Sequence, residues 1–350
     1  MKLKSINVFR RKLTKFITGS VGNPLKSLSD LDRIKDVNSI KKILIIRTNH
    51  RLGNILLITP LVQEVQEIFP NARVSFFVKG GVTPVLFQNY DRIDNYLLLP
   101  KKHFKELLSY LKTWFKLLFK KYDLVINVES GSSSGKLATK FSKSSYKFYG
   151  NEFDNLISFS TDQVHFAKLP VYKLRNYVFE NQDFNKPIPQ LNIKLNTTEL
   201  ASGKKLVDAL VPDNSKKTIA IFTFATGSKC YSKQWWNEFY EALNTQFSKY
   251  NLIEILPVEN VSQIDFKLPT FYSKDLREIA SFIENIDVFI GADSGMMHLA
   301  AATSTTVFGL FSITAIEKYG SYGTKKYAIN TNTTSINLII EAIKESQNQA

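Results

Sequence analysis

The sequence predicts an α/β protein of two Rossmann-like domains, each a doubly wound parallel β-sheet with helices on both faces. Short β-branched runs alternate with segments of helical periodicity, which is typical of parallel sheets. The alternation stops in a proline-containing stretch near the middle of the chain and then restarts. The length of 350 residues suits two domains, each large enough to bury a core.

Composition narrows the class of protein. The chain is 44% hydrophobic and 22% charged, as is ordinary for a folded protein. Its one cysteine, Cys230, excludes an intrachain disulfide and fits a reducing compartment. The sequence has no apolar run of the roughly 20 residues that span a bilayer, and no signal peptide, so we expect a cytoplasmic protein.

The formal net charge is +15, which indicates an anionic partner such as nucleic acid, anionic lipid or a phosphorylated substrate. Zinc-finger spacing and RNP-type motifs are missing from the sequence, so nucleic acid is not expected. Residues 1–40 form a basic leader with apolar residues at helical spacing: Ile6, Phe9, Leu13, Phe16 and Ile17. This pattern predicts a peripheral helix on an anionic membrane, and the alternative is a solvated terminus.

The first domain is expected over residues 41–195. We expect strands over 43–46, 74–78, 96–99 and 124–128, and helices over 57–68, 103–121 and 134–141. In the helix over 103–121, one face carries Lys105, Lys112, Lys116 and Lys120, and another carries Leu107, Leu111, Trp114 and Leu118. This helix is either a second membrane contact or a core helix with a solvated lysine face.

The second domain is expected over residues 196–350, after a stretch containing Pro170, Pro187 and Pro189. We expect strands over 219–224, 252–256, 288–290 and 306–310, and helices over 234–247, 276–285, 296–302 and 335–345. We assign the final helix to this domain, with packing back on the first domain as the alternative. Two such domains predict a ligand cleft facing the carboxyl ends of both sheets.

Three loops follow predicted strands, where open α/β sheets bind ligands. Residues 47–54 contain one glycine, Gly53, so they form neither a dinucleotide fingerprint nor a P-loop. The alternative is a simple turn with Asn54 as a helix N-cap. Residues 224–236 offer hydroxyl groups, a glycine and lysines at a helix start, which suits a diphosphate.

The third loop, residues 291–302, ends a strand and opens a helix. Asp293 or Ser294 can cap that helix, and Gly295 lets a ligand approach its free N–H groups. His298 follows one turn later, facing either the cleft or the sheet. The alternative is a capped, alanine-rich core helix with a satisfied histidine.

Together these loops resemble the family 9 glycosyltransferases, the ADP-heptose:lipopolysaccharide heptosyltransferase family. The resemblance runs from Lys41 to about Gly323. The segments that resemble the family's opening are residues 42–47, 52–53, 59–61 and 69–72. The segments that resemble its most specific stretch are 293–295, 298–302 and 310–312, extended by 319–320 and 322–323.

The resemblance implies a GT-B architecture and inverting transfer without a metal or cofactor. The donor would be a nucleotide-diphosphate sugar, with ADP-heptose a candidate, bound mainly by the second domain. The acceptor would be a lipid-linked glycan such as the lipopolysaccharide core, met at the inner face of the cell membrane. The implied donor-binding residues are Thr226 and Lys233 for the diphosphate, the backbone of Ser294, Gly295 and Met296, Asp293 for the sugar, and also His298. Lys136 matches a basic residue of the family's first domain.

One position departs from the family. Its opening loop reads Leu-Gly-Asp, and that aspartate is taken as the base that deprotonates the acceptor, whereas this chain has Asn54. A carboxamide is neutral and cannot take the proton, so His50 and Glu129 become the candidate bases. The alternatives are a solvent-exposed loop histidine and an ion-pairing or helix-capping acid.

Two other classes of protein remain as alternatives. The first is a catalytically silent sugar-nucleotide or glycan-binding protein on the same scaffold, for which Asn54 is the reason. The second is a nicotinamide-dependent oxidoreductase, against which the missing glycine fingerprint counts.

Overall fold

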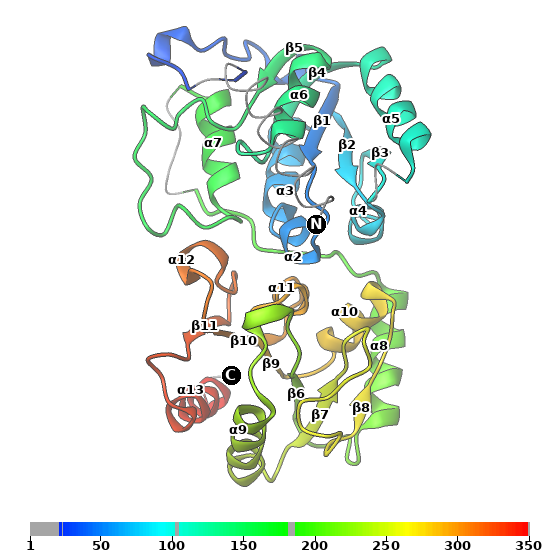
Figure 1. Ribbon diagram of the computed structural model, residues 1–350, viewed down its shortest axis with the longest axis vertical. Helices are drawn as coiled ribbons and strands as arrows, with labels where there is room; N and C mark the ends of the chain where they lie inside the picture. The colour runs from blue at the N-terminus through cyan, green and yellow to red at the C-terminus, as the bar shows by residue number, and fades with distance from the viewer. Residues whose placement is uncertain (1–20, 23, 102–104, 181–185, 349–350) are drawn as a thin grey trace, which may run out of the picture. The chain divides into compact units, whose positions relative to one another are not determined.

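The chain forms two compact units (Figure 1), and the computed structural model describes residues 21–22, 24–101, 105–180 and 186–348. Unit 1 contains the described residues up to His50, with Pro60–Pro84 and Tyr90–Pro189. Unit 2 contains Arg51–Thr59, Val85–Asn89 and the described residues from Gln190 onward. The predicted leader helix lies outside the described residues.

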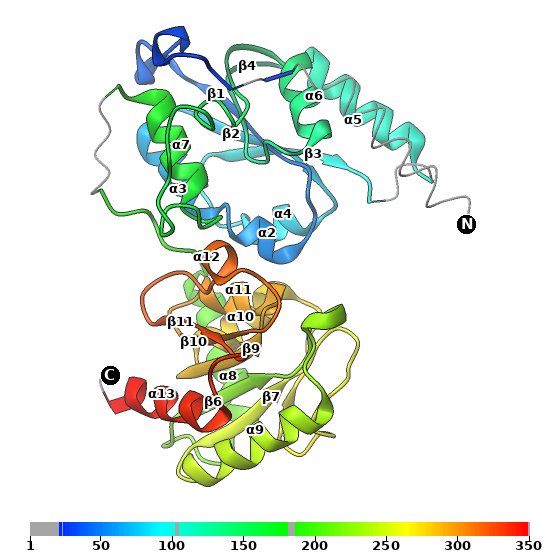
Figure 2. The same cartoon turned by 60° about the vertical axis from the view of Figure 1, so that its left-hand side comes forward.

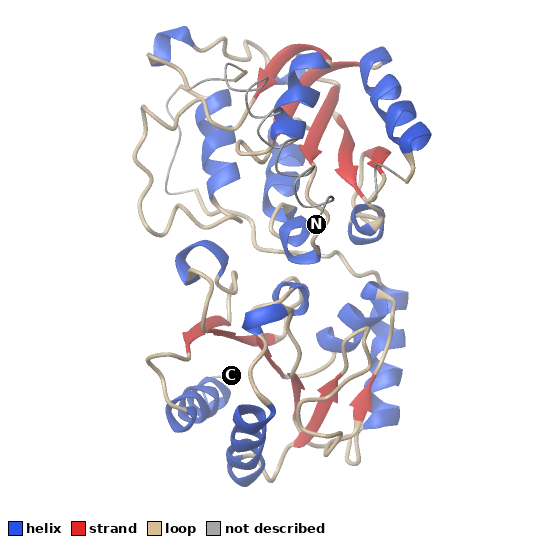
Figure 3. Cartoon of the chain, viewed as in Figure 1, coloured by secondary structure: helices blue, strands red, loops and turns tan. Residues whose placement is uncertain are grey.

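Unit 1 is built on a five-stranded parallel sheet, sheet A, with strand order β3-β2-β1-β4-β5. Its strands are β1 (Lys42–Arg47), β2 (Arg73–Lys79), β3 (Ile93–Leu99), β4 (Lys121–Asn127) and β5 (Lys143–Phe148). The central residues of β1, β2 and β4 are buried because helices cover both faces of the sheet (Figure 3). The predicted doubly wound parallel sheet is confirmed for this unit.

The longer helices of unit 1 lie in two pairs, one on each face of sheet A (Figure 2). They are α3 (Thr59–Ile68), α5 (Leu107–Phe119), α6 (Ser133–Phe141) and α7 (Leu169–Val178). α5 contacts β3 and α6. α7 is tied to α3 by a buried ion pair in which Arg175 Nε and Nη2 donate to the two carboxylate oxygens of Glu64, at 2.8 and 3.0 Å.

Unit 2 is built on a six-stranded parallel sheet, sheet B, with strand order β11-β10-β9-β6-β7-β8. Its strands are β6 (Thr218–Phe222), β7 (Asn251–Ile255), β8 (Thr270–Phe271), β9 (Val288–Ala292), β10 (Thr306–Phe311) and β11 (Lys326–Asn330). Its helices are α8 (Thr197–Leu210), α9 (Lys233–Gln246), α10 (Leu276–Glu284), α11 (Gly295–Ala301) and α13 (Ile336–Asn348). Every residue of β6, β7, β9 and β10 is buried, as expected for a sheet covered on both faces.

The final helix, α13, packs within unit 2. Its buried residues Ile339, Ile340 and Ile343 join the core cluster of sheet B, together with Trp236 and Phe239 of α9. The structure therefore places the apolar face of this helix in the core of the second unit. An amphipathic helix docks where its apolar face meets an uncovered part of a sheet, which periodicity alone does not locate.

Several short or irregular elements differ from the sequence prediction. The short helices are η1 (Leu28–Asp30), η2 (Val37–Ser39), α2 (Leu52–Leu56), α4 (Val82–Leu86), η3 (Gly227–Lys229) and α12 (Ile316–Tyr319). The helix expected over 57–68 is α3, and α2 is a separate short helix before it that the sequence prediction did not include. The N-cap of α2 is Arg51, so Asn54 lies inside the helix and its prediction as an N-cap is wrong.

The proline-containing stretch begins as a helix and not as a linker. Pro170 occupies the start of α7, where a proline is tolerated because the first N–H groups of a helix have no intrahelical acceptor. The compact units meet in the sequence at Pro189 and Gln190, a few residues before the expected boundary. A further helix, α8, begins at an Asn196–Glu199 capping box that the sequence prediction overlooked.

Candidate functional site

The loop after β9 carries the candidate residues with the most specific pattern. Asp293 follows the strand directly and is 5% exposed, and its backbone N–H donates to the Leu310 carbonyl at 2.9 Å. Ser294 is the N-cap of α11, with its side chain accepting from the Met297 N–H at 3.2 Å. Both bonds hold the opening of α11 at the carboxyl edge of sheet B. The first N–H groups of the helix, at Gly295 and Met296, have no intrahelical acceptor.

A lysine from the loop after β6 meets this aspartate. Lys229 Nζ lies 2.6 Å from Asp293 Oδ2 and donates to it, although the two residues are 64 positions apart. The carboxylate is buried, whereas the lysine side chain remains 36% exposed. The pair therefore presents one buried anion and one accessible cation at the same edge of sheet B. The sequence singled out the loop but not Lys229, because two lysines in that loop were equivalent by pattern.

Polar groups from the loops after β10 and β11 extend the same edge. The Tyr231 hydroxyl lies 2.8 Å from Thr331 Oγ1, and the Asn332 side chain donates to the Ser312 carbonyl at 2.8 Å. Burial raises the pKa of Tyr231, so its phenol stays protonated at neutral pH. The Tyr231 ring stacks on Trp235, with 4.4 Å between centroids. These contacts hold the loop after β6 against the sheet edge.

The two predicted diphosphate contacts in this loop are accessible. Thr226 is exposed and is the N-cap of η3, and Gly227 next to it adopts a φ of +67°. Lys233 is the first residue of α9, and its exposed ammonium forms an ion pair with Asp265. An ion pair between two exposed side chains contributes little to stability, so the lysine is available for another anion.

Gly295 and His298 serve a packing role within unit 2. A Cβ at Gly295 would lie 2.9 Å from Leu52 Cβ, and one at Gly53 would lie 2.6 Å from the His298 ring. His298 is 3% exposed. The glycine at 295 thus leaves room for Leu52 of α2, and its role toward a ligand stays a prediction. The histidine packs beside α2 and not against open solvent, because Gly53 leaves room for its ring.

The carboxyl edge of sheet A carries a second polar group of residues. Arg47 Nη1 lies 3.3 Å from Glu129 Oε2, and the hydroxyls of Thr48 and Ser132 are 2.7 Å apart. Ser132 also caps α6, in which Lys136 is half-buried. Glu129 is therefore an ion-paired acid, which was the alternative to a catalytic base in the sequence analysis. Its side chain remains 36% exposed. A carboxylate that is paired but accessible can still receive a proton.

The other candidate base, His50, and the family's base position, Asn54, belong to different units. His50 is exposed and is the last residue of the first segment of unit 1. Asn54 is half-buried in α2, which belongs to unit 2. Both candidate bases, Glu129 and His50, thus belong to unit 1, and Asn54 belongs to unit 2.

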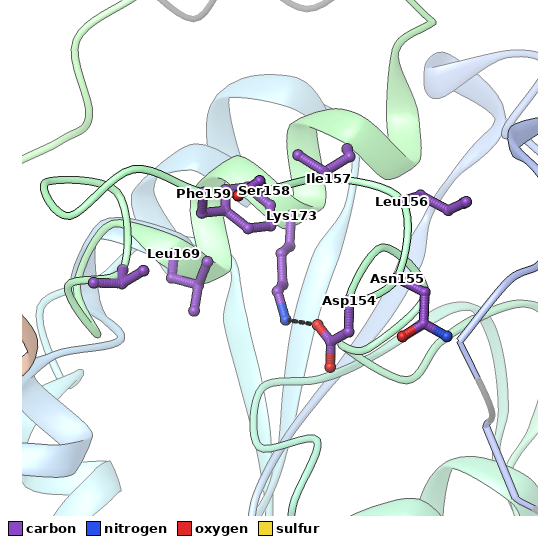
Figure 4. A pocket seen from close by; sticks show the side chains of 9 residues that line it. Asp154, Asn155, Leu156, Ile157, Ser158, Phe159, Leu169 and Lys173 are labelled. Atoms are coloured by element: carbon purple, nitrogen blue, oxygen red, sulfur yellow. Dashed lines mark hydrogen bonds and ion pairs between the residues drawn. The ribbon is translucent and has the colours of Figure 1, made fainter.

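Unit 1 also contains a cavity of about 520 Å³ that the sequence did not indicate (Figure 4). Polar and apolar residues both line it, and the apolar ones are Leu156, Ile157, Phe159, Val164 and Leu169. Lys173 reaches into it from α7 and donates to Asp154 at 2.6 Å and to the Gly150 carbonyl at 2.9 Å. Glu152 lies between Gly150 and Asp154 in the sequence. Its side chain is buried, and burial raises its pKa to about 6. No motif marks this cavity because its walls come from an irregular loop.

Two further observations concern metals and membranes. Among the residues that the structure describes, no three His, Cys, Asp or Glu side chains converge as metal ligands do. The described helices also include none that is long and apolar enough to cross a bilayer.

The fold is similar to that of solved glycosyltransferases. A family 9 glycosyl transferase from Veillonella parvula has a TM-score of 0.70 at 14% identity, covering 91% of this chain and 98% of its own. The ADP-heptose lps heptosyltransferase II of E. coli gives 0.65 at 13% identity, covering 88% and 100%. E. coli heptosyltransferase WaaC, solved with ADP, gives 0.62 at 15% identity, covering 87% and 99%. Two parallel-sheet α/β units of this kind have the GT-B architecture, so the predicted fold class is confirmed.

The family comparison matches one segment of unit 2. Residues 271–346 match the model of glycosyltransferase family 9 (heptosyltransferase). This segment runs from the end of β8 into α13 and includes the loop from Asp293 to His298. The resemblance to family 9 is therefore confirmed over residues 271–346, which lie in unit 2. No curated protein matches the chain.

Proposed function

We propose that the protein transfers a heptose-like sugar, with inversion, from a nucleotide-diphosphate donor to a lipopolysaccharide core or a related surface glycan. The observation that carries the proposal is the Lys229–Asp293 pair beside the opening of α11, of which Asp293 and α11 lie inside the segment that matches the family. WaaC has been solved with ADP and with ADP-2-deoxy-2-fluoro heptose, which supports ADP-heptose as the first donor to test.

In this proposal the donor occupies the carboxyl edge of sheet B. The diphosphate is held by Thr226, Lys233 and the backbone N–H groups at Ser294, Gly295 and Met296. Such donors suit a dianion because charge-assisted hydrogen bonds are about twice as strong as neutral ones. Asp293 accepts from the sugar hydroxyls, since a carboxylate would repel phosphate. Lys229 is a further cation of this site, and it shares its charge between Asp293 and the diphosphate. No metal or cofactor takes part in the proposed reaction.

Unit 1 supplies the acceptor side of the reaction. Inverting transfer needs a group that removes the acceptor proton as the glycosidic bond breaks. We assign this role to Glu129 or His50, because the carboxamide of Asn54 can orient a hydroxyl but cannot deprotonate it. The enzyme works at the inner face of the cell membrane, where the lipid-linked acceptor is found.

Calorimetric titration with ADP tests the donor site. Lys233→Ala should raise the dissociation constant of ADP roughly tenfold, if the contact is worth about 1.4 kcal/mol. Lys229→Ala should weaken binding as well, and Lys205→Ala, an exposed lysine on α8, serves as the matched control. Unchanged ADP affinity in Lys233→Ala would remove that residue from the site. A thermal-shift screen of nucleotide-diphosphate sugars then identifies the donor.

The alternative is a catalytically silent sugar-nucleotide or glycan-binding protein, and Asn54 is the observation that favours it. Release of nucleotide from the donor distinguishes the two functions. A transferase releases nucleotide from its donor when an acceptor is supplied, whereas a binding protein is stabilised by the same donor without turnover.

A further inference from the structure

Helix α5 exposes more apolar surface than sheet A can cover. Its buried residues are Thr113 and Leu117, and Tyr110 and Trp114 pack partly against the same core cluster. Five large apolar residues stay exposed, which we call the α5 surface: Leu107, Leu108, Leu111, Phe115 and Phe119. Leu108 is 84% exposed and Phe119 is 76% exposed.

These five side chains point the same way. At about 100° per residue, they fall within one arc of about 120° on the helix. The opposite side of α5 contacts β3 and α6, so the arc faces outward from unit 1 (Figure 2). A contiguous apolar patch of this kind is uncommon on a soluble protein and marks an interaction site. The helix therefore packs one side on sheet A, as a core helix does, and leaves an apolar side uncovered.

Cations border the α5 surface. From Leu107 to Lys121 the sequence contains four lysines and no acidic residue. Lys112 and Lys116 lie directly beside the apolar arc and are exposed. Lys143 approaches the far end of the arc, with its Nζ 5.9 Å from the centre of the Phe119 ring.

The amino edge of sheet A continues this positive charge. Four of its five strands begin with a basic residue, and with two neighbours these form a set that we call the basic edge: Lys41, Lys42, Arg73, Lys120, Lys121 and Lys143. All but Lys143 line a cavity of about 670 Å³ whose lining contains one acid, Asp94. Asp123, which is nearby, accepts the backbone N–H groups of Lys41 and Lys42, each at 2.8 Å.

We propose that the α5 surface and the basic edge together dock unit 1 on an anionic phospholipid bilayer. The apolar side chains enter the boundary between headgroups and acyl chains, and the lysines with Arg73 bind lipid phosphates. A bilayer fits this arrangement because it presents anionic headgroups above an apolar interior. The cations beside the apolar arc would meet the headgroups, and the arc itself would meet the acyl chains. The inference deepens the proposed function by naming a partner, and rests on it only for the lipid-linked acceptor that makes a bilayer relevant.

Vesicle flotation of the full chain tests the docking surface without donor or acceptor. We expect binding to phosphatidylcholine vesicles that contain about 30 mol% phosphatidylglycerol, because anionic lipid gives the vesicle a negative surface potential. We expect little binding to vesicles of pure phosphatidylcholine. Lys112→Gln with Lys116→Gln should weaken binding roughly 30-fold, since two basic residues contribute about 1 kcal/mol each. Lys205→Gln with Lys274→Gln, two exposed lysines of unit 2, is the matched control. Equal loss in both pairs would overturn the proposal, because net charge alone would then explain the binding.

A site-specific probe separates α5 from the leader as the point of contact. We would label Phe115→Cys in a Cys230→Ser background with an environment-sensitive fluorophore, with Leu338→Cys on α13 as control. On anionic vesicles, the label at 115 should shift to the blue and be quenched by brominated lipid, and the label at 338 should not. An aqueous label at 115 on bound protein overturns the proposal, and so does a concentration-dependent dimer that buries the label without lipid.

The proposed function and this inference can fail independently. Leu108→Ser with Phe115→Ser should lower vesicle binding at least roughly tenfold, because each side chain loses apolar burial. Transfer to a soluble, delipidated acceptor should stay unchanged in this variant. Loss of vesicle binding with transfer intact supports docking, whereas vesicle binding in a protein without transfer leaves docking supported and contradicts the proposed function.

Discussion

At the scale of single residues, Asn54 is the position where this chain departs from the family 9 pattern, so the proposed transfer needs another base. Glu129 is ion-paired with Arg47 at 3.3 Å yet partly exposed, and His50 is exposed in the loop after β1. We expect Glu129→Gln or His50→Ala to lower the transfer rate by about 10²-fold, the smallest effect typical of a general base. The measurement is transfer from the identified donor to its acceptor.

Two outcomes would change this assignment. If neither substitution lowers the rate, both candidates are wrong. If Asn54→Asp alone produces activity in an otherwise silent protein, the binding-protein alternative is correct.

The protonation of Glu152 makes the stability of the fold depend on pH. Burial raises its pKa to about 6, although its carboxylate accepts N–H groups from Tyr149 and Gly150. An unfolded glutamate has a pKa of about 4.3, so the folded state binds this proton more tightly. Its stabilising contribution is complete below about pH 4.3 and is lost as the pH rises through about 6.

We therefore expect the free energy of unfolding to fall by up to about 2 kcal/mol across this window through Glu152. Glu152→Gln should flatten this part of the pH profile in urea titrations. Glu341→Gln, at an exposed position of α13, is the control. Parallel profiles for wild type and Glu152→Gln would show that the folded pKa is not raised.

At the scale of elements, the packing of α2 on α11 depends on two glycines. A Cβ at Gly53 would lie 2.6 Å from the His298 ring, and one at Gly295 would lie 2.9 Å from Leu52 Cβ. Either alanine must push the two helices apart, and overpacking of this kind costs about 1–3 kcal/mol. We expect Gly53→Ala to lower the melting temperature of the protein by several degrees, as measured by calorimetry.

The matched control is Gly131→Ala, since a Cβ there meets nothing within 4 Å. Adding His298→Ala should restore part of the stability lost in Gly53→Ala, because the clashing ring is removed. An unchanged melting temperature in Gly53→Ala would mean that α2 does not pack on α11 in solution.

At the scale of the whole molecule, the two units should respond differently to the donor. The proposed donor residues lie in unit 2, while the candidate bases Glu129 and His50 lie in unit 1. A ligand at 100 times its dissociation constant adds about 2.7 kcal/mol to the stability of the state it binds. We expect ADP to slow hydrogen exchange in α11 and in the loop 224–236, and to leave α5 and α6 unchanged. Equal protection in both units would contradict a donor site confined to unit 2.

The class of fold was predictable from the sequence. Alternating strand and helix patterns, read from residues a few positions apart, predicted most strands of both sheets. The polar edge strand β5 and the helix α7 behind Pro170 were missed, because an edge strand needs little apolar surface and a proline at a helix start resembles a break. The loop from Asp293 to His298 was found because its capping and small residues are contiguous.

Local pattern by itself determined most of the strands, most of the longer helices, and the loop that resembles family 9 most specifically. The tertiary structure decided that Lys229 pairs with Asp293, that α2 packs on α11 through Gly53, and that α5 turns an apolar face outward. The reason is physical. Periodicity records which side of an element is apolar, but whether that side is buried, and which distant group meets a charge, depends on where the chain brings other segments.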